Sequence, residues 1–216
     1  MRVVVTGAAS GIGLAVIQKF LEEGHTVFGI DIESATYAHP NYKHFVADVR
    51  GPLPDIENVD ILINNAGVQN SGADIDINLK GLINCTEKYG VQPKISSIVN
   101  IAASSAHTGA DFPEYCASKG GVLAYTVNVA KRIAKYGATC NSLSFGGVLT
   151  DLNDCVMNDP VKWKQIMDMT PLKRWTTAKE CAIWIYFMAM VNQSCSGQDI
   201  VIDNLESFNH TFVWKD

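Results

Sequence analysis

The feature that most constrains the fold of this chain is a β-branched run that leads through a glycine-rich turn into a helix. Residues 2–6 (Arg-Val-Val-Val-Thr) form a continuous run typical of a strand buried on both faces. Gly7, Gly11 and Gly13 follow, and residues 11–23 have the apolar period of a helix, which Gly24 ends. A strand, a glycine turn and a helix in this order begin a parallel β–α–β unit.

The rest of the chain repeats this alternation of short apolar runs with helical patterns. We expect further strands at residues 26–31, 43–47, 59–64, 95–102, 139–144 and 199–203, and helices at 75–89, 114–136 and 181–191. Asn64 comes only 16 positions after Asp48, so the helix between the third and fourth strands is reduced to a stub. The prediction is an α/β fold: a single Rossmann-type, doubly wound parallel sheet of about seven strands with helices on both faces, in one domain over residues 1–216.

Composition limits the partners and the compartment. The 216 residues are 47% hydrophobic and 18% charged, which is a globular composition. The net charge of −5 and the absence of a lysine or arginine run argue against nucleic acid, and no apolar stretch is long enough to cross a membrane. No secretory signal precedes the first strand, so we expect a cytoplasmic protein. The six cysteines lack Cys-x-x-Cys spacing and the five histidines are scattered, so we expect reduced thiols and no metal.

The glycine turn is a candidate phosphate site. A loop without side chains lets backbone N–H groups approach a pyrophosphate, and the dipole of the following helix adds positive potential. Asp31 ends the second strand, 24 residues after Gly7, where its carboxylate can accept hydrogen bonds from ribose hydroxyls and repel a 2′-phosphate. Glu33 adds a second negative charge, so the cofactor expected here is NAD, not NADP. The alternatives are a structural turn and a solvated aspartate.

A second candidate site lies on the long helix. Tyr115 and Lys119 are four residues apart, so a phenol and an ammonium share one helix face. This spacing alone also arises by chance on any amphipathic helix. Beside a dinucleotide site, however, a proton donor with an adjacent cation indicates carbonyl and alcohol redox chemistry.

These motifs together resemble the short-chain dehydrogenase/reductase family in its classical subtype, from Val3 to Asp203. The matching segments are Thr6–Gly13, Asp48–Val49, Asn64–Gly67, Asn78 within Ile-Asn-Leu-Lys-Gly, Tyr115 with Lys119, Asn141–Thr150 and Ser196–Asp203. The resemblance implies that Tyr115 exchanges a proton with the substrate oxygen. It also implies that Lys119 holds the nicotinamide ribose and lowers the pKa of the phenol together with the oxidised nicotinamide, and that Asn78 tethers a water linking Lys119 to solvent.

The resemblance also implies which residues contact the cofactor. They lie in the glycine turn, after the second, third and fourth strands, in the catalytic helix and after the sixth strand: Gly7, Ser10, Gly11, Ile12, Gly13, Asp31, Ile32, Asp48, Val49, Asn65, Ala66, Gly67, Tyr115, Lys119, Gly146, Val148 and Thr150.

Three positions depart from the family pattern. The family places a catalytic serine at the end of the fifth strand, but a gapless match of Ile98–Ile101 puts Ala103 in that position. Ser104 and Ser105 follow at once; we assign Ser104 as the donor to the substrate oxygen, and the alternative is that both serines only cap a turn. Phe145 replaces the usual proline. Asn204 and Leu205 replace the usual Gly-Gly pair.

The substrate side is expected in the lid, residues 151–170. Its large side chains, Met157, Trp163, Ile166, Met167 and Met169, suit either a broad apolar pocket or ordinary packing. His107 and Asp111 are expected near the pocket mouth in a solvated loop, and Arg174 is expected to anchor the lid.

The expected function is NAD-dependent hydride transfer between nicotinamide and a secondary alcohol or ketone, with a hydroxysteroid-like or other apolar small-molecule substrate. The alternatives are a catalytically weak or inactive dinucleotide-binding protein that acts as a sensor or assembly subunit, and an epimerase or dehydratase. The family commonly forms a homodimer or homotetramer through the helices at 75–89 and 114–136. The apolar segment Phe208–Trp214 offers a further contact with a second copy.

Overall fold

Seven parallel strands form the central sheet in the order β3-β2-β1-β4-β5-β6-β9. The structure is a computed structural model that describes residues 1–110 and 112–208. The strands are β1 (Arg2–Thr6), β2 (Thr26–Asp31), β3 (Tyr42–Val46), β4 (Ile61–Asn64), β5 (Ser97–Ala103), β6 (Thr139–Phe145) and β9 (Asp199–Ile202). Val3 and Val5 face one core while Val4 faces the other, and none is exposed. The apolar run at the N-terminus is therefore a strand buried on both faces, as predicted.

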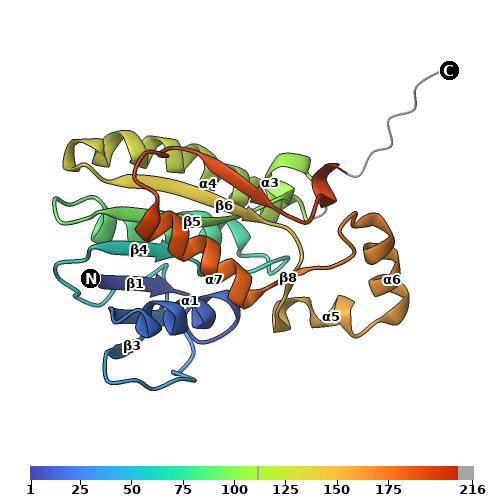
Figure 1. The fold of residues 1–216 in the computed structure, drawn as a ribbon, viewed down its shortest axis with the longest axis horizontal. Helices are drawn as coiled ribbons and strands as arrows, with labels where there is room; N and C mark the ends of the chain where they lie inside the picture. The colour runs from blue at the N-terminus through green and yellow to red at the C-terminus, as the bar shows by residue number, and fades with distance from the viewer. Residues whose placement is uncertain (111, 209–216) are drawn as a thin grey trace.

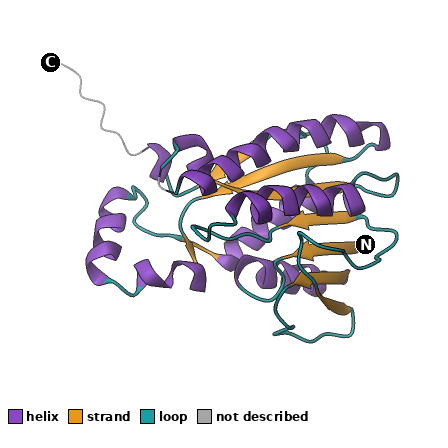
Figure 2. Cartoon of the chain, turned by 180° about the vertical axis from the view of Figure 1, so that it is seen from behind, coloured by secondary structure: helices purple, strands orange, loops and turns teal. Residues whose placement is uncertain are grey.

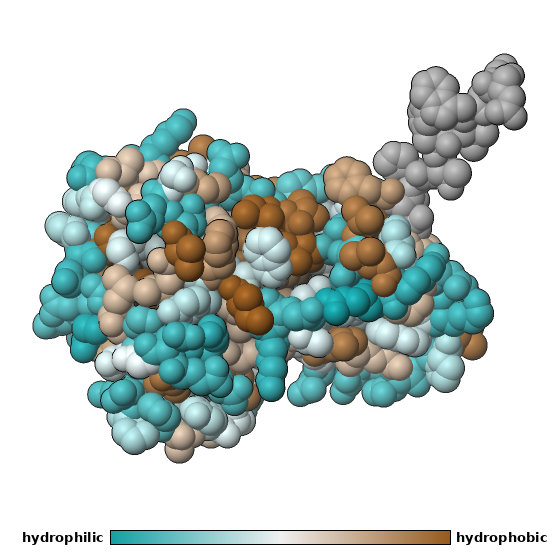
Figure 3. All heavy atoms as spheres, in the orientation of Figure 1, coloured by the Kyte–Doolittle hydropathy of each residue, from teal (hydrophilic) through white to brown (hydrophobic). Residues whose placement is uncertain are grey.

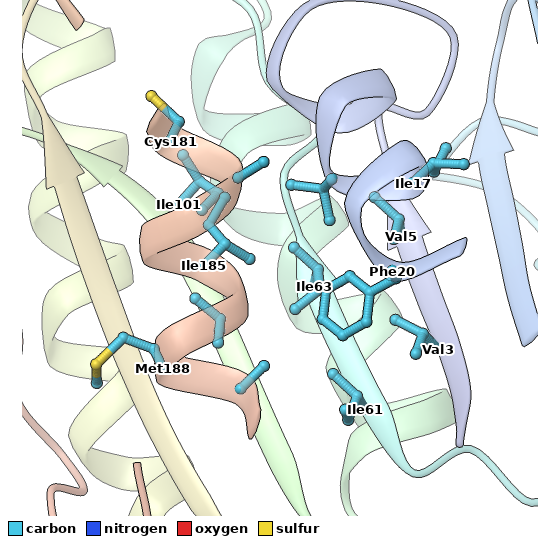
Figure 4. Packing of buried hydrophobic residues seen from close by; sticks show 14 of the residues in the cluster. Val3, Val5, Ile17, Phe20, Ile61, Ile63, Ile101, Cys181, Ile185 and Met188 are labelled. Atoms are coloured by element: carbon cyan, nitrogen blue, oxygen red, sulfur yellow. The ribbon is translucent and has the colours of Figure 1, made fainter. Parts of the chain in front are cut away.

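One face of the sheet is covered by helix α1 (Gly11–Glu22) and by helix α7 (Ala178–Tyr186), which continues into the π-helical turn η5 (Phe187–Val191). Figure 1 shows α1 and α7 side by side in front of the strands. Figure 4 shows Phe20 of α1 and Ile185 of α7 in one cluster with residues of the sheet. The labelled members of this core are Val3, Val5, Ile17, Phe20, Ile61, Ile63, Ile101, Cys181, Ile185 and Met188. The predicted helices at residues 11–23 and 181–191 are thus present.

The opposite face is covered by a second pair of helical segments, visible in Figure 2. The first segment runs through the π-helical turn η1 (Ile75–Gly81), α2 (Leu82–Cys85) and the π-helical turn η2 (Thr86–Gly90). The second is α4 (Pro113–Ile133), which ends in the 3-10 turn η3 (Ala134–Tyr136). Glu87 joins them, because its carboxylate accepts hydrogen bonds from Arg132 and from the Tyr125 hydroxyl. With helices on both faces, the doubly wound architecture is confirmed.

The connection between β3 and β4 contains no helix. Instead, Leu53, Ile56 and Val59 are buried against the sheet, and the Tyr89 hydroxyl donates a hydrogen bond to the carbonyl oxygen of Pro54 at 2.6 Å. These three apolar side chains of the loop cover the part of the sheet that a crossover helix would otherwise cover. The predicted shortening of this connection is therefore seen, and the stub carries no helical turn.

The lid is an excursion between two short parallel strands. β7 (Val148–Leu149) pairs with β8 (Thr176–Thr177), and between them lie η4 (Asp151–Asn153), α5 (Asp154–Met157) and α6 (Pro160–Met169). Figure 1 shows this segment in orange, projecting beyond the sheet. Helix α3 (Ser105–Thr108) follows β5, and the 3-10 turn η6 (Glu206–Phe208) follows β9. These pieces all stand at the carboxyl ends of the strands.

Asn204 and Leu205 adopt left-handed conformations, with φ of 54° and 70°. This is the region that glycine favours, which explains why a Gly-Gly pair suits this turn. The turn lies between the end of β9 at Ile202 and Glu206, the first residue of η6.

Part of the protein surface is apolar. Figure 3 shows hydrophobic residues grouped on the face formed by α7 and β9, where Ile183, Trp184 and Phe187 are exposed.

Within the described residues, no helix is long and apolar enough to cross a membrane, and no group of side chains suits a metal ion. No disulfide joins the cysteines of this described part. Of the predicted apolar tail, residues 209–214 lie outside the described residues.

Candidate active site

A cleft of about 1050 Å³ runs along the carboxyl edge of the sheet. Strand order reverses between β1 and β4, so the chain connections leave this edge in opposite directions. Such a switch point is where open parallel sheets bind ligands. One end of the cleft, which we call the β2 end, lies beside the segments after β2 and β3. The other, the lid end, lies among the lid, α3, η6 and the loop of residues 146–150.

The glycine turn forms the floor of the cleft near its middle. Gly7 has φ of 67°, and a Cβ atom added there would lie 2.8 Å from the Cα of Ala66. A Cβ on Gly13 would lie 1.8 Å from the carbonyl oxygen of Gly7. Both glycines are therefore required for the close packing of the turn against the helix and β4. Gly7, Ser10, Gly11 and Ile12 line the cleft, so the first N–H groups of α1 are available to an anion.

Asn65 holds this turn in place. Its side-chain nitrogen donates hydrogen bonds to the carbonyl oxygens of Thr6 and Gly7, at 3.1 and 3.0 Å. The Thr6 hydroxyl oxygen in turn accepts hydrogen bonds from the backbone N–H groups of Asn65 and Ala66. The end of β4 is thereby fixed to the end of β1. Asn65, Ala66 and Gly67 all line the cleft.

The β2 end of the cleft is rich in carboxylates. Asp31, Ile32, Glu33, Asp48, Val49 and Arg50 line it. Asp31 accepts hydrogen bonds from the backbone N–H of Ala9 at 2.9 Å and of Glu33 at 3.0 Å, which leaves lone pairs on both oxygens. Asp48 is held by the Arg50 guanidinium, which keeps the pKa of that carboxyl below its usual value. Arg50, the cation at this end, is thus already paired with a carboxylate.

Tyr115 and Lys119 both line the middle of the cleft. The Lys119 side-chain nitrogen lies 5.7 Å from the centroid of the Tyr115 ring and donates a hydrogen bond to the carbonyl oxygen of Ile101 at 2.8 Å. Lys119 is only 4% exposed, and burial lowers its pKa to about 8. Burial also raises the pKa of Tyr115 to about 12. The expected lowering of the Tyr115 pKa is therefore not produced by Lys119 alone, because desolvation of the phenolate dominates in the protein itself.

Asn78 lies in the π-helical turn η1, with its side chain between two other segments. Its Oδ1 accepts a hydrogen bond from the backbone N–H of Val68 at 2.8 Å, while Nδ2 donates to the Val68 carbonyl oxygen and to the Ser118 hydroxyl. A Cβ added to Gly67 would lie 3.2 Å from Asn78 Oδ1 and 3.5 Å from the Lys119 nitrogen. Asn78 and Lys119 thus converge on Gly67, and Oδ1 keeps one lone pair for a further donor.

Ser104 follows Ala103 at the carboxyl end of β5. Its backbone N–H donates to the carbonyl oxygen of Phe145 at 2.9 Å, so it extends the pairing of β5 with β6 by one residue before α3 begins. Ala103, Ser104 and Ser105 all line the cleft. The Ser105 hydroxyl is buried and has no hydrogen-bond partner in the described part of the chain. Phe145, which replaces the family's proline, is buried at the end of β6.

Comparisons with known proteins agree with this geometry. A family model described as Enoyl-(Acyl carrier protein) reductase matches residues 41–204. The short chain dehydrogenase adrF of Penicillium roqueforti is 34% identical over an alignment of 191 positions, which covers 74% of this chain and 74% of that protein. The chain belongs to the short-chain dehydrogenase/reductase family.

Solved structures share the fold over nearly the whole length. Aldohexose dehydrogenase of Thermoplasma acidophilum superposes with a TM-score of 0.84 at 25% identity, covering 100% of this chain and 97% of that one. A 4-hydroxyisoleucine dehydrogenase mutant, complexed with NADH and succinate, superposes with a TM-score of 0.83 at 24% identity, covering 94% and 97%. As a short-chain dehydrogenase/reductase, the chain is an oxidoreductase that acts on CH–OH or C=O groups.

The lid end of the cleft of this short-chain dehydrogenase/reductase is organised around Glu206. One carboxylate oxygen accepts hydrogen bonds from the Trp175 indole N–H at 2.6 Å and from the Thr170 hydroxyl at 3.2 Å. The other accepts from the backbone N–H of Gly147 at 3.1 Å. Glu206 thus connects the end of the lid to the loop of residues 146–150, in which Gly146, Val148 and Thr150 line the cleft.

The lid residues divide into two groups. Ile166 and Met169 line the cleft, whereas Trp163 packs edge-on against Trp175, with ring centroids 5.0 Å apart. Met157 and Met167 do not line the cleft. The apolar lining also includes Leu152, Val156, Phe112 and Trp175. From the sequence, these large side chains suited either an apolar pocket or ordinary packing of the lid. In the structure some of them line the cleft and others pack against neighbouring side chains.

Two other polar residues have structural contacts. His107 pairs with Asp199 of β9 at 2.7 Å and does not line the cleft, and Arg174 pairs with Glu180 at the start of α7. The expected anchoring role of Arg174 agrees with this contact. Asp111 lies outside the described residues.

Sequence reasoning missed Arg50, Glu206 and Ser207 as cleft residues. Arg50 and Glu206 stand soon after β3 and β9, at the carboxyl edge where ligands of such sheets bind. Their positions relative to strand ends were therefore a usable signal. What the sequence could not give was the partner of each charge, since the contacts of Glu206 come from residues 31 to 59 positions away.

Proposed function

We propose that this protein is an NAD(H)-dependent oxidoreductase that transfers hydride between nicotinamide and a secondary alcohol or ketone. The observation that carries the proposal is that the Tyr115 and Lys119 pair lines the same cleft as the glycine turn of Gly7 and Gly11. This shared cleft supports the proposal that a proton donor and a dinucleotide site act on one bound substrate. When bound, the nicotinamide supplies the hydride in reduction and accepts it in oxidation.

The residues present fit a dinucleotide. A Cβ atom at Gly7 or Gly13 would collide with the turn, so the backbone there is left bare for a pyrophosphate. The residues that would hold the cofactor are those predicted from the sequence that line the cleft, with Gly13 supporting them from below: Gly7, Ser10, Gly11, Ile12, Asp31, Ile32, Asp48, Val49, Asn65, Ala66, Gly67, Tyr115, Lys119, Gly146, Val148 and Thr150.

Tyr115 is the general acid of the proposed reduction. As the carbonyl carbon gains hydride, the Tyr115 hydroxyl gives its proton to the carbonyl oxygen. Lys119 stabilises the resulting phenolate by its nearby positive charge and hydrogen-bonds the ribose. A proton then returns from solvent through a water held near Asn78 Oδ1 and Lys119, which converge on Gly67. In oxidation the same steps run in reverse, and Tyr115 takes the proton of the alcohol.

Ser104 is the proposed second donor to the substrate oxygen. It stands in the cleft wall directly after β5, and its hydroxyl makes no hydrogen bond to another described residue. A hydroxyl without a partner is able to donate to a developing oxyanion. A specific observation favours the alternative of a weak enzyme or a dinucleotide-binding sensor, namely that Ala103 occupies the position where the family carries serine.

The preference for NAD rests on the charges at the β2 end of the cleft. Asp31 retains lone pairs for two ribose hydroxyls, and Glu33 adds a second carboxylate beside it. The Arg50 guanidinium is paired with Asp48. A 2′-phosphate placed here would meet two carboxylates and no unpaired cation of the described residues, which opposes NADP.

The proposed substrate is a hydroxysteroid-like or other apolar small molecule, because Ile166, Met169 and Leu152 line the lid end of the cleft. The proposed assembly is a homodimer or homotetramer, and the exposed Ile183, Trp184 and Phe187 supply apolar surface for it. Sedimentation equilibrium tests the assembly: a mass that stays at one chain over a wide concentration range would contradict it.

The decisive experiment follows NADH and NADPH oxidation with a panel of ketones, using Tyr115→Phe as the control. Reduction with NADH that the control lacks supports the proposal. Preference for NADPH would overturn the assignment of Asp31. NADH binding without turnover of any ketone or alcohol would instead favour the dinucleotide-binding protein.

A further inference from the structure

The charged groups lining the cleft are unevenly distributed. Five carboxylates line it within the described residues, those of Asp31, Glu33, Asp48, Asp151 and Glu206, against two cations. One cation, Arg50, is at the β2 end and is paired with Asp48. The other is Lys119, below the middle of the cleft. The lid end, where the substrate binds in the proposed function, therefore contains Asp151 and Glu206 and, in the described part, no arginine or histidine.

Glu206 is held rigidly toward this end of the cleft. Its three hydrogen-bond donors are the Trp175 indole, the Thr170 hydroxyl and the Gly147 backbone, and each of them is uncharged. No lysine, arginine or histidine of the described chain forms an ion pair with it. Its negative charge is thus fixed in position by neutral dipoles and is not cancelled by a neighbour.

Lys119 does not offset this charge for a substrate. It is almost fully buried, and its nitrogen donates a hydrogen bond to the carbonyl oxygen of Ile101. In the proposed mechanism its remaining hydrogen bonds go to the ribose and to the proton relay. An anionic substituent at the lid end would therefore meet Glu206 and Asp151 without a compensating cation among the described residues that line the cleft.

We propose that Glu206 is a specificity-determining residue that makes this enzyme select uncharged or cationic carbonyl compounds over carboxylates. The proposal rests on the proposed function, since it concerns the substrate of the same site. Two unit charges of like sign a few ångströms apart repel strongly at the effective dielectric of about 20 found near protein surfaces. The repulsion should lower kcat/KM for an anionic ketone by about tenfold or more relative to its neutral counterpart.

The test compares matched keto acids, their primary amides and their methyl esters, with the carboxyl group several bonds from the ketone so that carbonyl reactivity is equal. We expect the amide and ester to exceed the acid by about tenfold in kcat/KM. Glu206→Gln removes the charge at equal size, and it should narrow this ratio at least about threefold, mainly by lowering KM for the acid. Glu206→Asp keeps the charge and should keep the discrimination. Equal rates for acid and amide with the unaltered protein would overturn the proposal.

The matched control is Glu22→Gln, which removes one carboxylate from the exposed side of α1 and should leave the acid-to-amide ratio unchanged. If Glu206→Gln does not fold, the acid, amide and amine series with the unaltered protein still decides, because the predicted order is amine and amide above acid. The shift in the melting temperature of the protein that each compound causes, with NADH present, measures charge selection in binding, whether or not the compound is turned over. If amide and amine bind more tightly than the acid but none of the compounds is turned over, the proposed function is wrong and the role of Glu206 stands. If acid and amide bind equally, the role of Glu206 is wrong.

Discussion

The side-chain nitrogen of Lys119 lies 5.7 Å from the centroid of the Tyr115 ring and is held there by the carbonyl oxygen of Ile101. Burial acts on the two groups in opposite senses, raising the pKa of Tyr115 to about 12 and lowering that of Lys119 to about 8. Burial disfavours each charged form, so a phenolate beside this ammonium would relieve the cost of both. In the proposed function, this pairing of phenolate and ammonium is the state that Tyr115 reaches after it gives up its proton.

The lowered pKa of Lys119 predicts how stability depends on pH. Between about 8 and its ordinary value of 10.5, the folded protein binds fewer protons than the unfolded chain, so the free energy of unfolding rises with pH. From about pH 7.5 to 9.5 we expect a gain of about 1–2 kcal/mol relative to Lys119→Met, which lacks the titrating group. Urea unfolding of both proteins at the two pH values measures it. Parallel pH profiles would show that Lys119 titrates normally.

Asp31 is predicted to set the choice of cofactor. Asp31→Asn removes the charge and one acceptor for the ribose, so we expect KM for NADH to rise about tenfold and the preference over NADPH to narrow. Glu33→Gln, which removes a neighbouring charge and no predicted ribose contact, should relieve the repulsion of NADPH with little change in KM for NADH. Steady-state kinetics with both cofactors measures these effects. If Asp31→Asn leaves both values unchanged, the carboxylate has no role in cofactor choice.

The two serines after β5 are predicted to differ. Ser104→Ala should lower kcat about 100-fold with little change in KM, since the loss of one donor to a developing oxyanion has about that effect. Ser105→Ala removes a buried hydroxyl with no partner in the described residues, and its kcat should stay within about threefold. The reverse order of effects in single-turnover rates would assign the donor to Ser105.

The glycine turn gives a prediction about stability. Gly13→Ala would place a Cβ atom 1.8 Å from the Gly7 carbonyl oxygen, so we expect destabilisation by several kcal/mol, roughly the upper range for point substitutions, and loss of NADH binding. Gly120→Ala, in the middle of α4 with nothing within 4 Å of the new Cβ, should instead stabilise by about 0.5–1 kcal/mol. Thermal melts of both variants provide the comparison. A tolerated alanine at position 13 would mean that the turn is looser than it is here.

The sequence predicted the sheet because its strands are marked by continuous apolar runs. Arg2–Thr6 and Thr26–Asp31 were identified to the residue, since burial on both faces leaves an unbroken apolar pattern. The third strand is one residue earlier than predicted, and the fourth begins at Ile61 and not at residue 59. The residues that flank these two strands mix apolar and polar types, so the sequence does not show where each strand begins or ends.

The site was less accessible to sequence reasoning where contacts join distant segments. The π-helical turn around Asn78 has no signature in residue order, and neither does the convergence of Asn78 and Lys119 on Gly67. The opposing effects of burial on Tyr115 and Lys119 depend on depth below the surface, which spacing along a helix does not reveal. Glu206 follows a predicted strand, but its three donors lie far away in the chain.

The most direct test of the central claim is the rate of ketone reduction by Tyr115→Phe, measured together with its Kd for NADH. Removing only the hydroxyl should lower kcat by about 100-fold or more, the range for loss of a general acid, while NADH binding stays within about threefold of the unaltered protein. A variant that binds NADH and reduces ketones at the unaltered rate would show that Tyr115 does not supply the proton.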